Sequence, residues 1–186
     1  SESVKEIGNV DVKKVGEYQL RYVVRDAAGN DAQEVVRTVV VGDTGRPVIT
    51  LKGSATVTHE AGTAYSDEGA GAEDAVDGIV TLITSGSVTE GTPGIYTLSY
   101  SATDSVGNTS MVTRKVTVQD TIGPLITLSG SSTMTHEAST AYIDEGASAE
   151  DAVDGTVTVT TSGLLTVGTP GTYTLSYSAT DATGNT

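Results

Sequence analysis

The sequence contains no cysteine, phenylalanine or tryptophan, and only four of its 186 residues are proline. Without cysteine, the chain forms no disulfide and offers no thiolate ligand to a metal. Without phenylalanine and tryptophan, its core has to be built from Val, Ile, Leu, Ala and Tyr. No apolar run approaches the roughly 18 residues that a membrane-spanning helix needs. We therefore expect no membrane insertion by this segment.

Basic residues are also scarce, with 10 Lys and Arg against 24 Asp and Glu and a net charge of −14. A chain this acidic is a poor partner for nucleic acid, because Lys and Arg have to neutralise the phosphates. Clustered carboxylates become tolerable once a cation neutralises them. The alternative interpretation is that the acidity only keeps a secreted protein soluble. Composition alone leaves both interpretations open.

What the sequence does have is repetition. The stretch Gly91–Thr109, GTPGIYTLSYSATDSVGNT, returns almost unchanged 77 positions later as Gly168–Thr186. A looser copy covers Val15–Asp31. In the two near-identical copies Tyr, Leu and Ala alternate with Thr and Ser, which is the period of a strand with one buried face. The pattern predicts β-modules about as long as one Ig-sized domain.

The repeats predict three modules. Residues 1–43 correspond to the C-terminal half of a repeat, residues 44–121 to a complete repeat, and residues 122–186 to a repeat without its last strand. Because Ser1 begins partway through a repeat, we expect the chain to be an excerpt of a longer protein. The linkers are short and contain proline, which limits bending, so we expect an elongated array.

Within the complete repeat, the alternation and the turn residues predict five strands, near 47–52, 55–60, 79–84, 95–103 and 111–119. A long acidic loop, with room for one short strand or helical turn, is expected over 65–78. Short strands separated by turns are typical of an antiparallel β-sandwich. The pattern around Tyr96 is typical of the tyrosine corner of Ig-like domains, and the alternative is that Tyr96 is one more core aromatic. The predicted fold class is all-β, as tandem Ig-like antiparallel β-sandwich domains.

A longer pattern runs through the complete repeat, and its parts recur in the other two. It reads P-x-I-T-L, then an acidic Ala/Gly loop with D-x-x-D-G, then G-x-Y-x-L-x-Y-x-A-x-D-x-x-G-N and R-x-V-x-V-x-D. This pattern resembles bacterial immunoglobulin-like repeats of large surface proteins and adhesins, and is similar to the hyalin-repeat and cadherin-like groups. The resemblance implies a secreted, extracellular or cell-surface setting, with calcium at or near the junctions between modules.

The acidic loop is the best candidate for a site. Asp74 and Asp77 lie three residues apart with Gly78 directly after Asp77, and hard cations such as calcium take about six to eight oxygen ligands. Calcium is favoured over other metals because cysteine is missing and histidine is rare. The alternative is that these residues only form turns. The candidate metal ligands are acidic residues of the loops, strand ends and linkers: Asp74, Asp77, Asp104, Glu60, Asp120, Asp43, Asp151, Asp154, Asp181 and Glu137.

No catalytic motif is present. The pair His59-Glu60 lacks the second histidine of a zinc-peptidase helix, because Thr63 stands at that position. A hydrolase triad drawn from Ser66, His59 and Asp67 has no G-x-S-x-G elbow. We interpret the two histidines as structural and expect no enzyme activity.

These observations favour a non-enzymatic stalk or adhesion segment, stiffened by calcium. Its partners would be neighbouring repeats of the same chain, with a homotypic or host-surface partner beyond them. Two alternatives stay open. One is a carbohydrate- or protein-binding module of a secreted protein. The other is a filament subunit, in which another chain adds a strand to an incomplete terminal repeat.

Overall fold

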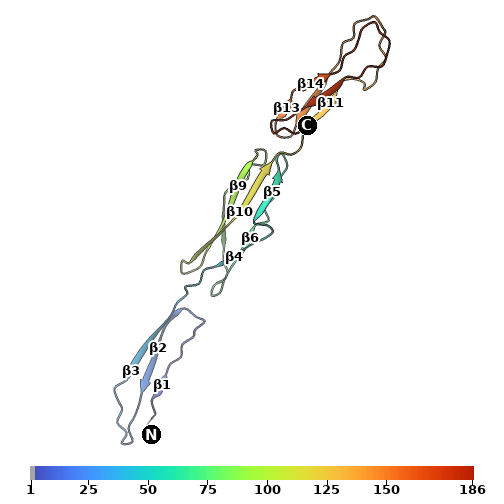
Figure 1. Ribbon diagram of the computed structural model, residues 1–186. Helices are drawn as coiled ribbons and strands as arrows, with labels where there is room; N and C mark the ends of the chain where they lie inside the picture. The colour runs from blue at the N-terminus through green and yellow to red at the C-terminus, as the bar shows by residue number, and fades with distance from the viewer. Residues whose placement is uncertain (1–2) are drawn as a thin grey trace. The chain divides into compact units, whose positions relative to one another are not determined.

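The computed structural model describes residues 3–186, which form strands, turns and loops but no helix (Figure 1). The all-β prediction is confirmed. In the first repeat one antiparallel sheet holds three strands, β1 (Lys5–Ile7), β2 (Gly16–Val23) and β3 (Val35–Val41). The alternating exposure along β2 follows its Tyr and Leu residues, which share one face of the strand.

The second repeat forms two sheets. The smaller one is antiparallel and contains β4 (Val48–Leu51), β6 (Ala70–Asp74) and β7 (Gly78–Ile79). The larger one has the order β5 (Thr56–Glu60), β10 (Thr109–Gln119), β9 (Gly94–Thr103) and β8 (Leu82–Ser85). The five strands expected from the sequence are all present, with shifted ends. The acidic segment contributes β6 and β7 in addition.

One pair of strands differs from the antiparallel arrangement expected from the sequence. β5 lies parallel to β10, with five residue pairs running from Thr56 beside Lys115 to Glu60 beside Gln119. No hairpin constrains this pair, because the strands are far apart in the chain. β5 pairs with the free edge of β10, and its direction is set by the side from which the chain arrives after β4.

Small and medium apolar side chains build the core, as the composition requires. Val116 and Val118 are almost fully buried and form a cluster with Ala61. Fully burying a valine contributes about 1.5–3 kcal/mol. Arg114 is also buried, with only 1% exposed. Its Nε donates to the carbonyl of Ser54 at 2.9 Å, and its guanidinium pairs with Asp67.

Tyr96 forms the tyrosine corner, so that interpretation is confirmed. Its hydroxyl donates to the carbonyl of Thr92, four residues upstream, at 2.8 Å. Leu98, two residues further on, is a buried core residue. The equivalent tyrosines, Tyr18 and Tyr173, make the same bond four residues back, also at 2.8 Å. This bond fixes the turn that precedes each central strand.

The third repeat has a three-stranded antiparallel sheet of β11 (Leu125–Leu128), β12 (Ala147–Asp151) and β13 (Gly155–Val157). A second sheet pairs β14 (Val159–Ser162) with β15 (Ser176–Ala179). Residues 133–137, which correspond to β5, form no strand.

The chain's internal contacts divide it into two compact units that cut across the second repeat. Among the described residues, the first comprises 3–53, Glu68–Thr84 and Ser99–Val112, and the second comprises Ser54–Asp67, Ser85–Leu98 and Thr113–Thr186. Each unit contains one linker between repeats. None of the described segments forms a helix long and apolar enough to cross a bilayer.

Candidate metal centre

A tight loop with the sequence Asp-x-x-Gly-Asn follows β9. Oδ1 of Asp104 accepts hydrogen bonds from the backbone N–H groups of Val106 (3.0 Å) and Asn108 (2.7 Å). Its Oδ2 accepts from Nδ2 of Asn108 at 2.6 Å. Gly107 has φ of 101°, a conformation that favours glycine. The loop therefore holds the Asp104 carboxylate in one orientation at the end of the strand.

A second carboxylate comes from the acidic loop. Asp74 is the last residue of β6 and is only 4% exposed. Its Oδ1 accepts hydrogen bonds from the backbone N–H groups of Val76 (2.8 Å) and Asp77 (3.1 Å), which close the loop as an Asx turn. Its Oδ2 is buried and has no hydrogen-bond partner.

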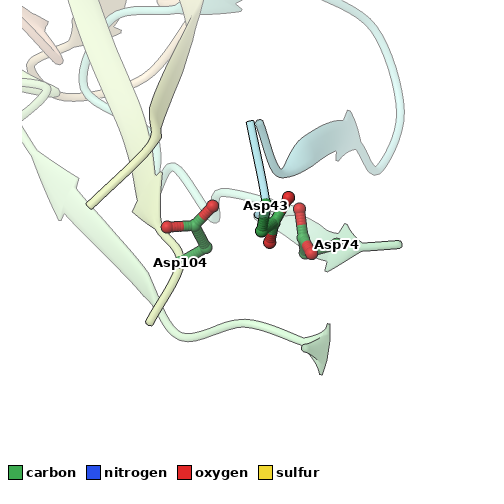
Figure 2. Close-up of side chains that lie close together, drawn as sticks. All are labelled: Asp43, Asp74 and Asp104. Atoms are coloured by element: carbon green, nitrogen blue, oxygen red, sulfur yellow. The ribbon is translucent and has the colours of Figure 1, made fainter. Parts of the chain in front are cut away.

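The linker after β3 supplies the third carboxylate, and the three meet in the first unit (Figure 2). Oδ1 of Asp43 accepts from the backbone N–H of Gly45 at 2.9 Å, while its Oδ2 is buried without a partner. Nδ2 of Asn108 also reaches the Asp43 carbonyl at 3.4 Å. One carboxylate oxygen from each of Asp43, Asp74 and Asp104 lies within 4.8 Å of the others.

The second unit repeats this arrangement with Asp120, Asp151 and Asp181, which obey the same 4.8 Å limit. Asp120 follows β10, Asp151 ends β12, and Asp181 lies just after β15. Nδ2 of Asn185 donates to the Asp120 carbonyl at 3.2 Å and to Oδ2 of Asp181 at 2.7 Å. Oδ2 of Asp120 is buried and has no partner. Within residues 3–186 these are the two groups of three acidic side chains with this spacing.

The donor set fits a hard divalent cation. Two oxygens bound to one calcium ion lie at most about 5 Å apart, because each is roughly 2.3–2.6 Å from the ion. A buried carboxylate oxygen without a partner is costly unless a cation or water satisfies it. Asp43, Asp74 and Asp120 each have one such oxygen. These residues would hold the ion, which would supply charge neutralisation and no reaction chemistry.

The pKa values of three of these carboxylates are shifted by burial, neighbouring charges and hydrogen bonds. The pKa of Asp120 is raised by desolvation and by the charges of Asp151 and Asp181. Desolvation is also the largest influence on Asp181 and raises its pKa, but hydrogen bonds, chiefly from Asn185, outweigh it, so the pKa of Asp181 is lowered. The pKa of Asp104 is also lowered, because desolvation raises it but hydrogen bonds, chiefly from Asn108, outweigh that effect. Burial and the neighbouring carboxylates thus disfavour the charged form of Asp120.

Four of the predicted ligands lie outside both clusters. The Asp77 carboxylate accepts from the backbone N–H of Ser105 at 2.6 Å and from its hydroxyl at 3.0 Å. Asp154 accepts from the backbone N–H of Ala182 at 2.6 Å. Each of these two therefore connects the acidic loop to the Asp-x-x-Gly-Asn loop.

The other two are glutamates at the β5 positions. Both carboxylate oxygens of Glu60 accept from Thr121, one from the backbone N–H at 2.8 Å and one from the hydroxyl at 2.7 Å. Glu137 is exposed, and its carbonyl accepts from the Thr140 hydroxyl. The structure therefore brings together six of the ten predicted ligands, in two groups of three.

The sequence analysis missed the part played by two asparagines. Asn108 and Asn185 each join the carboxylate at a strand end to the linker carbonyl, and so hold two members of a cluster together. The signal was present in the recurring Asp-x-x-Gly-Asn motif, which predicted only a loop. The bond to the linker depends on a contact more than 60 positions away in the chain.

Comparison with known families identifies the class of protein. The chain belongs to the family described as bacterial surface protein, Ig-like domain, whose model matches residues 1–41, 49–118 and 126–186. This confirms the resemblance seen in the sequence. Among curated proteins, no match is found.

Three solved structures are similar to parts of the chain. A lipoprotein of Bacteroides thetaiotaomicron is 28% identical over 45% of each chain, with a TM-score of 0.37. The structure of CBM51-2 in complex with GlcNAc and of INT domains from Clostridium perfringens ZmpB is 30% identical over 50% of this chain and 22% of that one, with a TM-score of 0.33. The M60 catalytic domain of ZmpB with CBM51-1 and CBM51-2 is 16% identical over 70% and 30%, with a TM-score of 0.36. The chain spans less than half the length of each.

Proposed function

We propose that this segment is a non-catalytic stalk of an extracellular bacterial surface protein, in which one calcium ion at each linker stiffens the connection between repeats. The observation that carries the proposal is the pair of linker clusters with unpartnered buried oxygens on Asp43, Asp74 and Asp120. Each cluster combines a linker carboxylate with two from the following repeat. A cation that binds all three restrains the linker as well as the domain.

The mechanism is electrostatic. Without a cation, the three carboxylates of a cluster repel one another and oppose the closed arrangement of the linker. A cation that binds the folded form, and not the unfolded chain, stabilises it by mass action. Calcium would therefore raise the melting temperature and reduce bending at both linkers together.

The tyrosines favour this function over a sugar-binding module. Carbohydrate sites commonly present exposed aromatic faces, but the hydroxyls of Tyr18, Tyr96 and Tyr173 donate to backbone carbonyls in corners. Tyr100 is 1% exposed. These side chains support the fold of the repeats.

Calcium titration of the whole chain tests the proposal. We expect isothermal titration calorimetry to find two sites, and chelation to lower the melting temperature by several degrees. Asp104→Asn should remove one site, because it withdraws a charge from the first cluster. Asp26→Asn is the matched control. Asp26 makes the same loop contacts to Asn30 but belongs to neither cluster, so both sites should remain. An identical melting curve in chelator and in millimolar calcium would remove calcium from this account.

A further inference from the structure

The acidic loop of the third repeat carries two apolar residues between its two aspartates, and they lie against the second repeat. Val153 packs on the cluster formed by Ala61, Val116 and Val118, which closes one end of the second repeat. Ala152 lies close to Gly62. A Cβ added to Gly62 would be 3.0 Å from the Cβ of Ala152. The Ala152–Val153 turn is therefore in direct apolar contact with the second repeat.

The surface that receives this turn also positions the linker carboxylate. The backbone N–H of Ala61 donates to the carbonyl of Gln119, directly before Asp120, at 2.8 Å. Glu60 holds Thr121, directly after Asp120, through both of its carboxylate oxygens. Asp120 is thus fixed from both sides by the end of β5 and the residue that follows it.

The docked turn positions the second carboxylate in the same way. The backbone N–H groups of Val153 and Asp154 donate to Oδ1 of Asp151 at 2.8 and 3.0 Å. Because the turn packs on Ala61 while its backbone holds Asp151, the apolar contact sets the separation between Asp151 and Asp120. The contact and the cluster form one structural element.

The first linker has the same cluster without this contact. Val76 is the equivalent of Val153, yet it is 49% exposed and lines an open recess with Val12, Val15 and Val41. The structure therefore shows one cluster whose turn is docked and one cluster whose equivalent valine is about half exposed.

We propose that docking of the Ala152–Val153 turn on Ala61 and Gly62 is part of the second cation site, so that calcium binding and contact between the second and third repeats strengthen each other. Val153 is a positioning residue for that site, whereas Val76 is not one for the first. The inference rests on the proposed function, because it requires that both clusters bind calcium. Coupling of this kind is reciprocal. The factor by which the docked turn raises the calcium affinity equals the factor by which bound calcium raises the equilibrium constant for docking.

The test isolates one cluster at a time in the full chain. Asp104→Asn leaves the second cluster as the calcium site, and Val153→Ser in that background should weaken its calcium affinity about tenfold, a change of about 1.4 kcal/mol. Asp181→Asn leaves the first cluster, and Val76→Ser there should change the affinity by less than about twofold. Circular dichroism and melting in chelator establish that each variant is folded, and Val153→Ala serves as the milder substitution.

The outcomes separate the two proposals. If the unmodified chain binds no calcium at either cluster, the proposed function and this inference both fall. If both clusters bind calcium but Val153→Ser leaves the affinity of the second cluster unchanged, the coupling is wrong while the cation sites stand.

Discussion

Two nearly identical pentapeptides in this chain adopt different structures. Thr56–Glu60, with the sequence TVTHE, forms strand β5 in the second repeat, whereas residues 133–137, TMTHE, form no strand in the third. The difference follows from the partner strand. β5 is paired with β10, whereas residues 133–137 are paired with no strand among the described residues. Whether this pentapeptide forms a strand therefore depends on a partner strand and not on its own sequence alone.

The same comparison extends to a buried ion pair. In the second repeat Asp67 pairs with Arg114. Its third-repeat equivalent, Asp144, accepts hydrogen bonds from the hydroxyl of Tyr177 at 2.7 and 2.8 Å. The hydrogen bond to Asp144, with desolvation and the Asp144 charge, raises the pKa of Tyr177 to about 12.

The largest expected effect comes from giving residues 133–137 a partner strand. Appending the sequence of residues 110–120 after Thr186 should give residues 133–137 a parallel strand to pair with. Their amides should then exchange with solvent on the order of a hundredfold more slowly, as measured by hydrogen–deuterium exchange. A scrambled extension of the same composition is the control. If the matched extension gives no more protection than the scrambled one, the partner strand does not explain the contrast.

The second expected effect is the loss of the buried ion pair. Arg114→Ala leaves Asp67 without its cation and opens space in the core, so the free energy of unfolding of the second repeat should fall by about 3–5 kcal/mol. Urea denaturation measures the change. Arg37→Ala is the matched control, because the first-repeat equivalent is exposed, and it should cost less than about 1 kcal/mol. Equal losses in the two variants would show that burial of Arg114 is unimportant.

The smallest expected effect concerns Tyr177 at alkaline pH. Its pKa is higher in the folded chain than the ordinary value of 10.0, so its contribution to stability is complete below about pH 10 and is lost as the pH rises through about 12. Asp144→Asn removes the acceptor charge and should move the tyrosinate transition back toward pH 10, as followed by ultraviolet absorbance. A transition that stays near pH 12 in this variant would assign the shift to burial alone.

Local patterns predicted much of the fold. The alternation in β9 and the recurring Tyr96 position gave the central strand and its corner, because both depend on residues close in sequence. β6 lies in the predicted acidic loop, which left room for one short strand or helical turn without locating it, since the residues AGAED have weak strand propensity. It forms a strand through its pairing with β4, where Val48 lies beside Glu73. The parallel direction of β5 is likewise set by a partner distant in sequence.

The candidate site was predicted in part for the same reason. Asp43, Asp74 and Asp104 were identified by residue type and by their places in loops and linkers. The sequence did not separate them from Asp77 or Glu60, which are equally acidic and equally well placed in the repeat. Only the three-dimensional arrangement assigns Asp77 to Ser105 and Glu60 to Thr121.

The parallel pairing of β5 with β10 has a mechanical consequence. Tension that enters the second repeat through β4 and leaves through the linker after β10 pulls these two strands in opposite directions along their length. The load is then shared as shear by all five registered residue pairs, which have to rupture together and not one after another. A protein at a bacterial surface meets drag from moving fluid, and this pair is the part of the repeat that would resist it.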